Sequence, residues 1–178
     1  MRSAFLVALL ILCFCSVSHA GDLGELTPAE GADGWKTVEM EGASLSWIGN
    51  EDSFSFRLEA PSTGWVAVGF GGGPAMKDAS LIMGYADDDG AHYRDDHGTS
   101  PVSHSPDIDN NGADDILEAD VQEYGDSTVF TFTLPVEPSD DLDPVLSPGD
   151  AIRILVAWGG GDGFSGMHRE ALSARIEL

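Results

Sequence analysis

Basic residues are scarce in this chain. Lysine and arginine together number 8 against 31 aspartates and glutamates, which gives a formal net charge of −23 over 178 residues. Such a surface repels nucleic acid and anionic membranes, so the composition argues against both as partners. The acidic residues are spread along the whole chain, a distribution typical of a solubility adaptation and also able to attract cationic partners.

Cysteine is absent beyond position 15, and long apolar stretches are absent beyond position 20. Cys13 and Cys15 both lie in the apolar stretch at the start of the chain, so the remainder has no disulfide and no thiolate chemistry. They follow Leu12 and Phe14, whereas a lipoprotein signal would place a small residue there. No stretch after Ala20 is long and apolar enough to span a bilayer, so we expect no membrane anchor.

The N-terminus has the three parts of a secretory signal. Met1 and Arg2 form a short positive region, residues 4–15 form an almost unbroken apolar run, and Ser18-His19-Ala20 supplies small residues at the cleavage positions. This pattern predicts a signal peptide over residues 1–20 that is removed near Ala20. The expected location is therefore extracytoplasmic, either periplasmic or secreted.

Helical periodicity is also missing, and alternation of apolar and polar residues takes its place. In the stretch 53–58, for example, Phe54, Phe56 and Leu58 alternate with polar residues, which is typical of a half-buried strand. Glycine, proline, asparagine and aspartate separate such segments. Strands are expected at 44–48, 53–58, 65–70, 81–85, 91–95, 121–124, 128–134, 151–158 and 172–178. The pattern predicts an all-β fold, an antiparallel two-sheet β-sandwich of about ten strands.

The expected sandwich occupies residues 35–178 as one domain. Residues 21–34 are polar and lack periodicity, so we interpret them as a linker. The segments 96–118 and 135–150 carry Pro, Gly and Asp and are expected to be surface loops, which at this length are often functional.

Two glycine-rich segments carry residues able to bind iron. Residues 71–78 include Met76, and residues 159–168 end in His168. Glycine allows the backbone to approach a flat or bulky group, and a thioether with an imidazole is a low-spin haem ligand pair suited to electron transfer. From residue types alone, a structural role is the commoner alternative to haem binding. Glycine-rich loops usually serve as turns, and a single methionine usually packs in an apolar core.

An ordered set of short motifs resembles the DOMON domain family. The motifs are Gly64–Phe70, Met76–Ala79, Ile82–Tyr85, Asp95–Thr99, Ser103-His104, Asp114–Leu117, Phe130–Phe132, Pro148-Gly149, Ala157–Gly159, Asp162 and His168-Arg169. The resemblance covers essentially residues 35–178. It implies a β-sandwich that binds b-type haem or, in some members, sugars, as in the cytochrome part of cellobiose dehydrogenase.

The resemblance also implies roles for particular residues. The family's axial methionine falls on Met76 and its axial histidine on His168. His104 recurs at a matching place in bacterial members, which implies a side chain that contacts an axial ligand or replaces one. A solvated loop histidine is the alternative. One departure concerns Arg169, which is followed by Glu170 where many members have glycine.

These observations together predict an exported DOMON module that binds haem b and acts in one-electron transfer with an unidentified redox partner. By itself it would not be an enzyme. The alternative is a haem-free module that binds carbohydrate or another ligand, with Trp47, Trp65 or Trp158 as a stacking face. A third class is a purely structural module.

A second cofactor expectation is calcium, in the segment 107–118. Oxygen-bearing residues occupy positions one, three, five, nine and twelve of an EF-hand-like loop, with Gly112 at six. These residues are Asp107, Asp109, Asn111, Asp115 and Glu118. Asp114 stands where EF-hands have an apolar residue and no helices are expected on either side, so a calcium-bound β-loop is the hypothesis and an ordinary acidic turn is its alternative.

Overall fold

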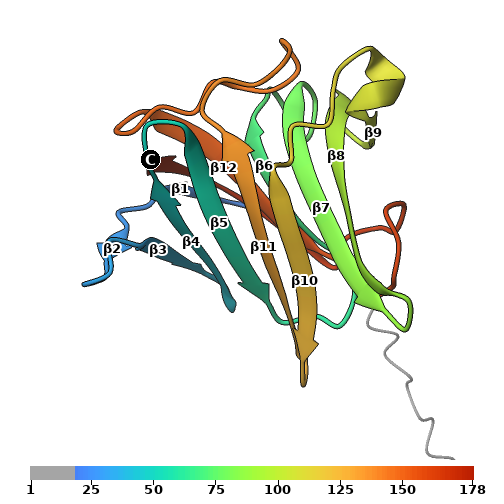
Figure 1. Cartoon of the computed structure of the whole chain (residues 1–178). Helices are drawn as coiled ribbons and strands as arrows, with labels where there is room; N and C mark the ends of the chain where they lie inside the picture. Colours follow the sequence, from blue (N-terminus) through green and yellow to red (C-terminus); the bar gives the residue numbers. More distant parts are fainter. Residues whose placement is uncertain (1–18) are drawn as a thin grey trace, which may run out of the picture.

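In the computed structural model, which describes residues 19–178, nearly all of the regular secondary structure is β-strand (Figure 1). The elements are β1 (His19–Glu25), β2 (Ala29–Glu30), β3 (Lys36–Met40), β4 (Ala43–Gly49), β5 (Ser53–Ala60), β6 (Val66–Gly71), β7 (Ala79–Asp87), β8 (Gly90–Ser100), β9 (Ser103–Pro106), the 3-10 helix η1 (Asp107–Asn110), β10 (Glu118–Tyr124), β11 (Ser127–Pro135), β12 (Ala151–Trp158) and β13 (Glu170–Glu177). The expected signal peptide lies almost wholly outside the described residues. Within them, no helix has the length and apolarity needed to cross a membrane.

The strands form two sheets that pack face to face (Figure 1). The larger sheet has the order β1-β13-β12-β6-β7-β8-β9, and the smaller has β10-β11-β5-β4-β3-β2. Neighbours in both sheets pair antiparallel except β1, which runs parallel to β13 at the edge of the larger sheet. The predicted antiparallel two-sheet sandwich is confirmed.

The strand boundaries predicted from the sequence agree best with the observed ones where one face of the strand is buried. The alternating segment 151–158 coincides with β12, whereas the segment 21–34, interpreted as a linker, contributes β1 and β2. Likewise the expected loop 96–118 contains the end of β8, then β9 and η1. These additional strands lie at or near sheet edges, where backbone hydrogen bonds to a neighbour are sufficient and no apolar alternation is needed.

The core between the sheets is held by a group of phenylalanines. Phe70 from the larger sheet lies with its ring centroid 4.9 Å from that of Phe56 in the smaller sheet, and Phe56 stacks on Phe132 at 5.2 Å. Phe54 and Phe130 extend the group along β5 and β11. Aromatic contacts of this kind add to the free energy of area burial, so this group fixes how the two sheets face each other.

Strands β6 and β7 are buried on both faces, unlike a strand at the surface of a sandwich. All residues from Val66 to Phe70, and all from Ala79 to Gly84, are buried. Their inner side chains, such as Val68 and Ile82, belong to the core between the sheets. Because an antiparallel sheet usually leaves one face to solvent, the outer face of the larger sheet at these strands needs a separate cover.

The close approach of the sheets at Gly84 yields a stability prediction. A Cβ atom at this position of β7 would lie 2.7 Å from Val121 Cγ2 and 3.1 Å from Phe130 Cε2. We expect Gly84→Ala to lower the free energy of unfolding by about 1–3 kcal/mol through overpacking, measured by guanidinium chloride denaturation. Gly161→Ala is the matched control, because Gly161 is exposed and a Cβ there meets nothing within 4 Å. Equal stability of the two variants would contradict the close inter-sheet contact.

Candidate functional site

The outer face of the larger sheet carries a second apolar cluster, separate from the core. Its buried members are Trp65, Ala67, Ala79, Leu81 and Met83, and the partly buried Met76, Tyr85, Leu155, Ala157 and Phe164 pack against them. We call this set the outer apolar cluster. An apolar surface on the outside of a sheet, covered by loops and not by another sheet, is the first candidate for ligand binding.

Small residues line up across the middle of this face. The strand register places Ala157 beside Ala67 on one side and beside Ala171 on the other. The next outward position on β6 is Gly69, over which the side chains of Leu81 and Leu155 lie. The side chains at these paired positions of three neighbouring strands are therefore single methyl groups, and the larger side chains of the outer apolar cluster pack around them.

The loop between β6 and β7 holds Met76 in a fixed place beside the cluster. Arg153 of β12 donates a hydrogen bond from Nη1 to the carbonyl oxygen of Ala75 at 3.2 Å. The backbone of β8 packs directly on the loop, since a Cβ atom on Gly98 would lie 1.7 Å from the Met76 carbonyl oxygen. Ala75 and Asp78 have left-handed φ angles of 53° and 59°, and such backbone strain concentrates at ligand-binding segments.

The glycine-rich loop between β12 and β13 folds around the indole of Trp65. The Trp65 backbone N–H donates to Gly161 O at 3.1 Å, and Gly159 N–H donates to Trp65 O at 2.9 Å. A Cβ atom on Gly159 would lie 2.1 Å from the indole nitrogen, and one on Gly166 would lie 2.9 Å from it. The glycines do allow a close approach to a flat group, and that group is a side chain of the chain itself.

His168 stands at the end of this loop with an unsatisfied ring nitrogen. The next residue, Arg169, donates its backbone N–H to Trp158 O at 2.8 Å, which fixes the start of β13. The His168 side chain is half-buried, and its Nδ1 is shielded from solvent without a hydrogen-bond partner among the described residues. A buried polar atom left unpaired costs about 1–3 kcal/mol, so Nδ1 is a candidate ligand atom. The neighbouring Met167 is 83% exposed.

The two loops leave the larger sheet at opposite ends of β6. Because β12 runs antiparallel to β6, Trp158 pairs with Val66 and Ile154 with Phe70. The His168 loop therefore begins beside the start of β6, and the Met76 loop follows its end. Phe164 brings the His168 loop onto the outer apolar cluster, with its ring centroid 5.0 Å from that of Tyr85. Met76 reaches the same cluster from the other end.

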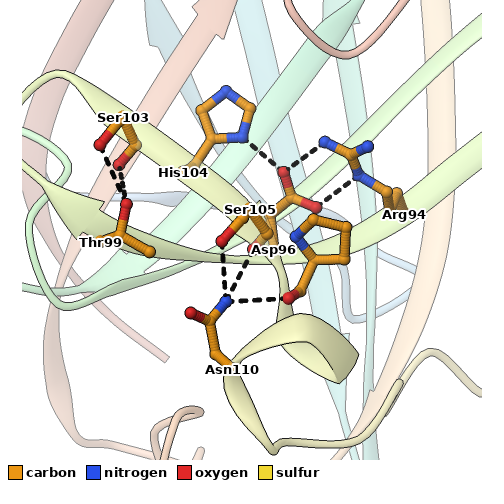
Figure 2. Close-up of polar contacts among 8 residues, drawn as sticks. Arg94, Asp96, Thr99, Ser103, His104, Ser105 and Asn110 are labelled. Atoms are coloured by element: carbon orange, nitrogen blue, oxygen red, sulfur yellow. Dashed lines mark hydrogen bonds and ion pairs between the residues drawn. The ribbon is translucent and has the colours of Figure 1, made fainter.

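A charged network adjoins the cluster on β8 (Figure 2). The fully buried carboxylate of Asp96 accepts hydrogen bonds from Arg94 Nε at 2.5 Å and Nη2 at 2.7 Å, and a further one from His104 Nδ1. Burial alone would raise the pKa of Asp96, but the hydrogen bonds from His104 and Arg94 hold it below its ordinary value. An ionised carboxylate only accepts, so His104 Nδ1 carries a proton. Arg94 also stacks over Phe164 at 4.4 Å. His104 therefore belongs to this network through its hydrogen bond to Asp96 and is not an isolated loop histidine.

Five aspartates gather at the end of the sandwich shown at the top of Figure 1, where η1 and the loop between β11 and β12 meet. They form two overlapping groups whose carboxylate oxygens lie within 4.8 Å of one another. The groups are Asp95, Asp107 and Asp143, and Asp115, Asp140 and Asp143. We call the five residues the acidic cluster. Such a set of oxygen ligands is what a hard divalent cation requires.

Burial perturbs the first of these groups strongly. It raises the pKa of Asp95 to about 8 and that of Asp107 to about 7, and the neighbouring charge of Asp143 adds to both shifts. Burial also raises the pKa of Asp143. In all three cases loss of water disfavours the charged carboxylate.

The acidic cluster differs from the loop expected for calcium. Asp107 and Asp115 are buried members of it, but Asp109 and Glu118 are exposed and belong to neither group. Asn111 is exposed, with a left-handed φ of 66°, and ends η1. The EF-hand spacing does not predict the whole cluster, because Asp95 comes from β8 and Asp140 and Asp143 come from the loop between β11 and β12. Asp95 is part of the adjacent acidic pair in the middle of β8, whereas nothing in the sequence distinguishes Asp140 and Asp143 from the other acidic loop residues.

The raised pKa values predict an inverted pH dependence of stability in cation-free buffer. Folded Asp95 and Asp107 keep their protons up to about pH 7–8, whereas unfolded aspartates lose them near pH 3.9. Between these limits the folded state binds more protons, so the free energy of unfolding falls as pH rises. We expect a decrease of at least about 1.4 kcal/mol, the equivalent of one pKa unit, between pH 5 and pH 8 in denaturant titrations.

Two substitutions separate the titration of Asp95 and Asp107 from that of other groups nearby. The other charged or titratable groups that face Asp95, Asp107 and Asp143 are Asp96, Asp114, Asp115, Asp140 and His97. Asp107→Asn removes a buried titrating carboxyl and should flatten the pH dependence. Asp109→Asn removes the same charge from an exposed position of η1 and should leave it unchanged. Identical profiles for both variants would refute the assignment.

Comparison with solved structures finds the same fold in two cytochrome domains. The cytochrome b domain of pyranose dehydrogenase from Coprinopsis cinerea matches with a TM-score of 0.61 and 13% identity, covering 80% of this chain and 81% of that one. The cytochrome domain of Myriococcum thermophilum cellobiose dehydrogenase matches with a TM-score of 0.54 and 10% identity, covering 85% and 88%. At these identities the likeness shows the fold alone. No curated protein matches the chain in sequence.

A family model gives the classification. The model of the DOMON domain matches residues 40–159, which is more than half of the chain and includes β4 to β12. Met76 lies inside the matched region, and His168 lies nine residues beyond its end. The chain belongs to the DOMON domain family, as its short motifs indicated.

Proposed function

We propose that this protein binds haem b on the outer face of the larger sheet, with Met76 and His168 as axial ligands, and that it transfers single electrons. The observation that carries the proposal is the outer apolar cluster. It covers strands that are buried on both faces, and both Met76 and Phe164 of the His168 loop pack against it. The ring nitrogen Nδ1 of His168 has no hydrogen-bond partner among residues 19–178. Membership in the DOMON family and likeness to two cytochrome domains support the same function.

The described residues fit this group in donor chemistry and in the apolar character of the surface. Aromatic and aliphatic side chains of the outer apolar cluster exclude water from the outer face, and the alanines in its middle are small. Bound haem would supply a ferric–ferrous couple, and a thioether ligand favours the ferrous state and a higher potential. His168 contributes a neutral imidazole nitrogen, while Arg153 and Gly98 keep the Met76 loop against the sheet.

Arg94 has a defined supporting role in this proposal. Its guanidinium lies on Phe164 of the His168 loop and pairs with the buried Asp96. Burial raises the pKa of Asp96, but the hydrogen bonds from His104 and Arg94 lower it by more. The Asp96 carboxylate therefore stays ionised. Arg94 is therefore held as a fixed cation at the margin of the outer apolar cluster, where it is available to the propionate groups of a haem.

The remaining parts of the function follow from the sequence expectations. We propose that the chain is a redox module for a separate partner and not an enzyme by itself, and that it is exported. Cleavage after Ala20 would remove only the first two residues of β1. Gly21 would still pair with Leu172 and Asp22 with Ser173, so the rest of this edge strand would remain in the sheet with the same register.

The carbohydrate alternative loses its structural basis. Trp47, Trp65 and Trp158 are 1%, 5% and 6% exposed, so none of the three offers a face for stacking on a sugar. Trp47 and Trp158 belong to the core between the sheets, and Trp65 lies under the glycine-rich loop.

The first prediction of this proposal is an absorption spectrum. Protein purified from haem-sufficient cells should show a Soret band that shifts and sharpens when dithionite reduces the iron. Apoprotein should regain this spectrum on titration with haemin. A colourless protein that also fails to bind haemin would refute the proposal, whatever its fold.

The second prediction distinguishes the two ligands. His168→Ala should lose most of the haem, because the strong nitrogen donor is removed. Met76→Ala should retain haem through His168 but show a lower reduction potential and a loosened low-spin spectrum, measured by redox titration. Met167→Ala is the control, since its side chain is 83% exposed beside His168, and it should resemble the wild type. Greater damage from Met167→Ala or His104→Ala would show that the ligands are assigned wrongly.

A further inference from the structure

Four buried carboxylate oxygens of the acidic cluster have no hydrogen-bond partner among the described residues. They are Oδ1 of Asp95, both oxygens of Asp107 and Oδ2 of Asp143. Asp95 and Asp107 are only 3% and 1% exposed, so water does not satisfy them from outside. Buried carboxylates are normally paired, hydrogen-bonded or bound to a metal. Three side chains from different segments thus each carry an unsatisfied oxygen, and each places a carboxylate oxygen within 4.8 Å of the other two.

Two members of the second group, Asp115 and Asp140, have hydrogen-bond donors from the protein itself. Asp115 accepts hydrogen bonds from the backbone N–H and the hydroxyl of Ser139, and Asp140 accepts from the N–H of Ala113 and of Leu142. These contacts order the loop between β11 and β12 against the segment after η1. The unsatisfied position is therefore confined to Asp95, Asp107 and Asp143.

Among residues 19–178 no lysine or arginine forms an ion pair with this position. The ion pairs found among residues 19–178 do not include any of the five aspartates. The contrast with the neighbouring Asp96 is informative, because that buried carboxylate has both Arg94 and His104 as partners. Leaving carboxylates buried without a counter-charge is strongly unfavourable, and a bound cation removes this cost.

We propose that Asp95, Asp107 and Asp143 form a buried calcium site. Their oxygens lie within 4.8 Å of one another, which is about twice the calcium–oxygen distance of 2.3–2.6 Å. An all-carboxylate set without cysteine or histidine disfavours zinc. Magnesium demands near-ideal octahedral geometry and gives up water reluctantly, whereas calcium accepts irregular ligand sets of this kind.

A small cavity beside the group is consistent with this site. It has a volume of about 10 Å³, and Ser80, Asp115 and Asp143 line its polar side. About 10–15 Å³ is the space that one water molecule occupies. Asp143 thus borders a space suited to a ligand water or to a shift of the ion.

The ion would fasten three segments at one end of the sandwich. Asp95 belongs to β8, Asp107 begins η1, and Asp143 lies in the loop between β11 and β12, which has no strand of its own. Asp95 pairs in register with Ile82 of the core, and Asp96 with Leu81 of the outer apolar cluster. Adjacent strand residues point to opposite faces, so this site and the haem site lie on different sides of β8 and are tested separately.

The test is calcium titration of the purified chain after removal of cations with EDTA. Isothermal titration calorimetry with calcium chloride should show one saturable site. The melting temperature should rise with calcium, rise less with magnesium and return on addition of EDTA. At a calcium concentration 100 times the dissociation constant, the folding equilibrium constant should increase about a hundredfold.

Matched variants locate the site. Asp107→Asn should weaken calcium binding by at least about tenfold, because affinity follows the charge of the ligands. Its melting temperature without calcium should be no lower than that of the wild type, since a buried unpaired charge is removed. Asp109→Asn, an identical change at an exposed position two residues away, should bind calcium as the wild type does.

Asp143→Asn tests the same site from a different loop and decides the matter if Asp107→Asn does not fold. Loss of calcium binding in the variants of Asp107 or Asp143 with retention in Asp109→Asn supports the site. Identical wild-type melting curves in calcium and EDTA with no binding heat overturn it. So does loss of the response in Asp109→Asn, which would restore an EF-hand-like loop. None of these measurements depends on haem.

Discussion

The larger sheet is apolar on both faces at β6 and β7, and the rest of the structure depends on covering both. The inner face meets the smaller sheet through the phenylalanine group around Phe56 and Phe70. Within residues 19–178 no second sheet covers the outer face, and two connecting loops pack on it instead. The glycine-rich loop between β12 and β13 folds around Trp65. Arg153 fixes the loop that contains Met76 through a hydrogen bond to the Ala75 carbonyl oxygen. A surface covered only by loops is a surface that a planar cofactor can share, which is the physical basis of the proposed haem site.

Strand β8 shows two different solutions to the burial of negative charge. Asp95 and Asp96 are neighbours, both are almost fully buried, and alternation turns them to opposite sides. The chain itself supplies Arg94 and His104 to Asp96, and the pKa of that carboxyl falls even though burial opposes it. On the other side Asp95 meets only further aspartates, and burial raises its pKa to about 8. In this acidic protein, Arg94 and His104 stabilise the charge of Asp96. The charge of Asp95 has no such partner among the described residues and requires a bound proton or a metal ion to neutralise it.

Much of the fold was predictable from local pattern, because one-sided burial leaves alternation in the sequence. The alternation predicts a strand at 151–158 with the bounds of β12, and it predicts one buried face at Phe54, Phe56 and Leu58, which belong to the core. Edge strands were missed where backbone pairing alone defines them, as in β1 and β9. The tryptophans were first considered as a sugar platform, and their burial could be known only after both sheets were assembled.

Periodicity, turn residues and short motifs are enough to predict the sandwich, the family and the two loops that carry Met76 and His168. Which residues meet depends instead on how the strands and loops pack in three dimensions. This packing brought Asp95 and Asp143 to Asp107 across β8 and a distant loop, and it left Asp109 and Glu118 outside, although their spacing fitted a calcium loop. The reason is that spacing along the chain governs ligands only within a self-contained turn. Here the ligands converge through strand pairing and loop packing, which join residues far apart in sequence, and burial then determines which carboxylates lack a partner.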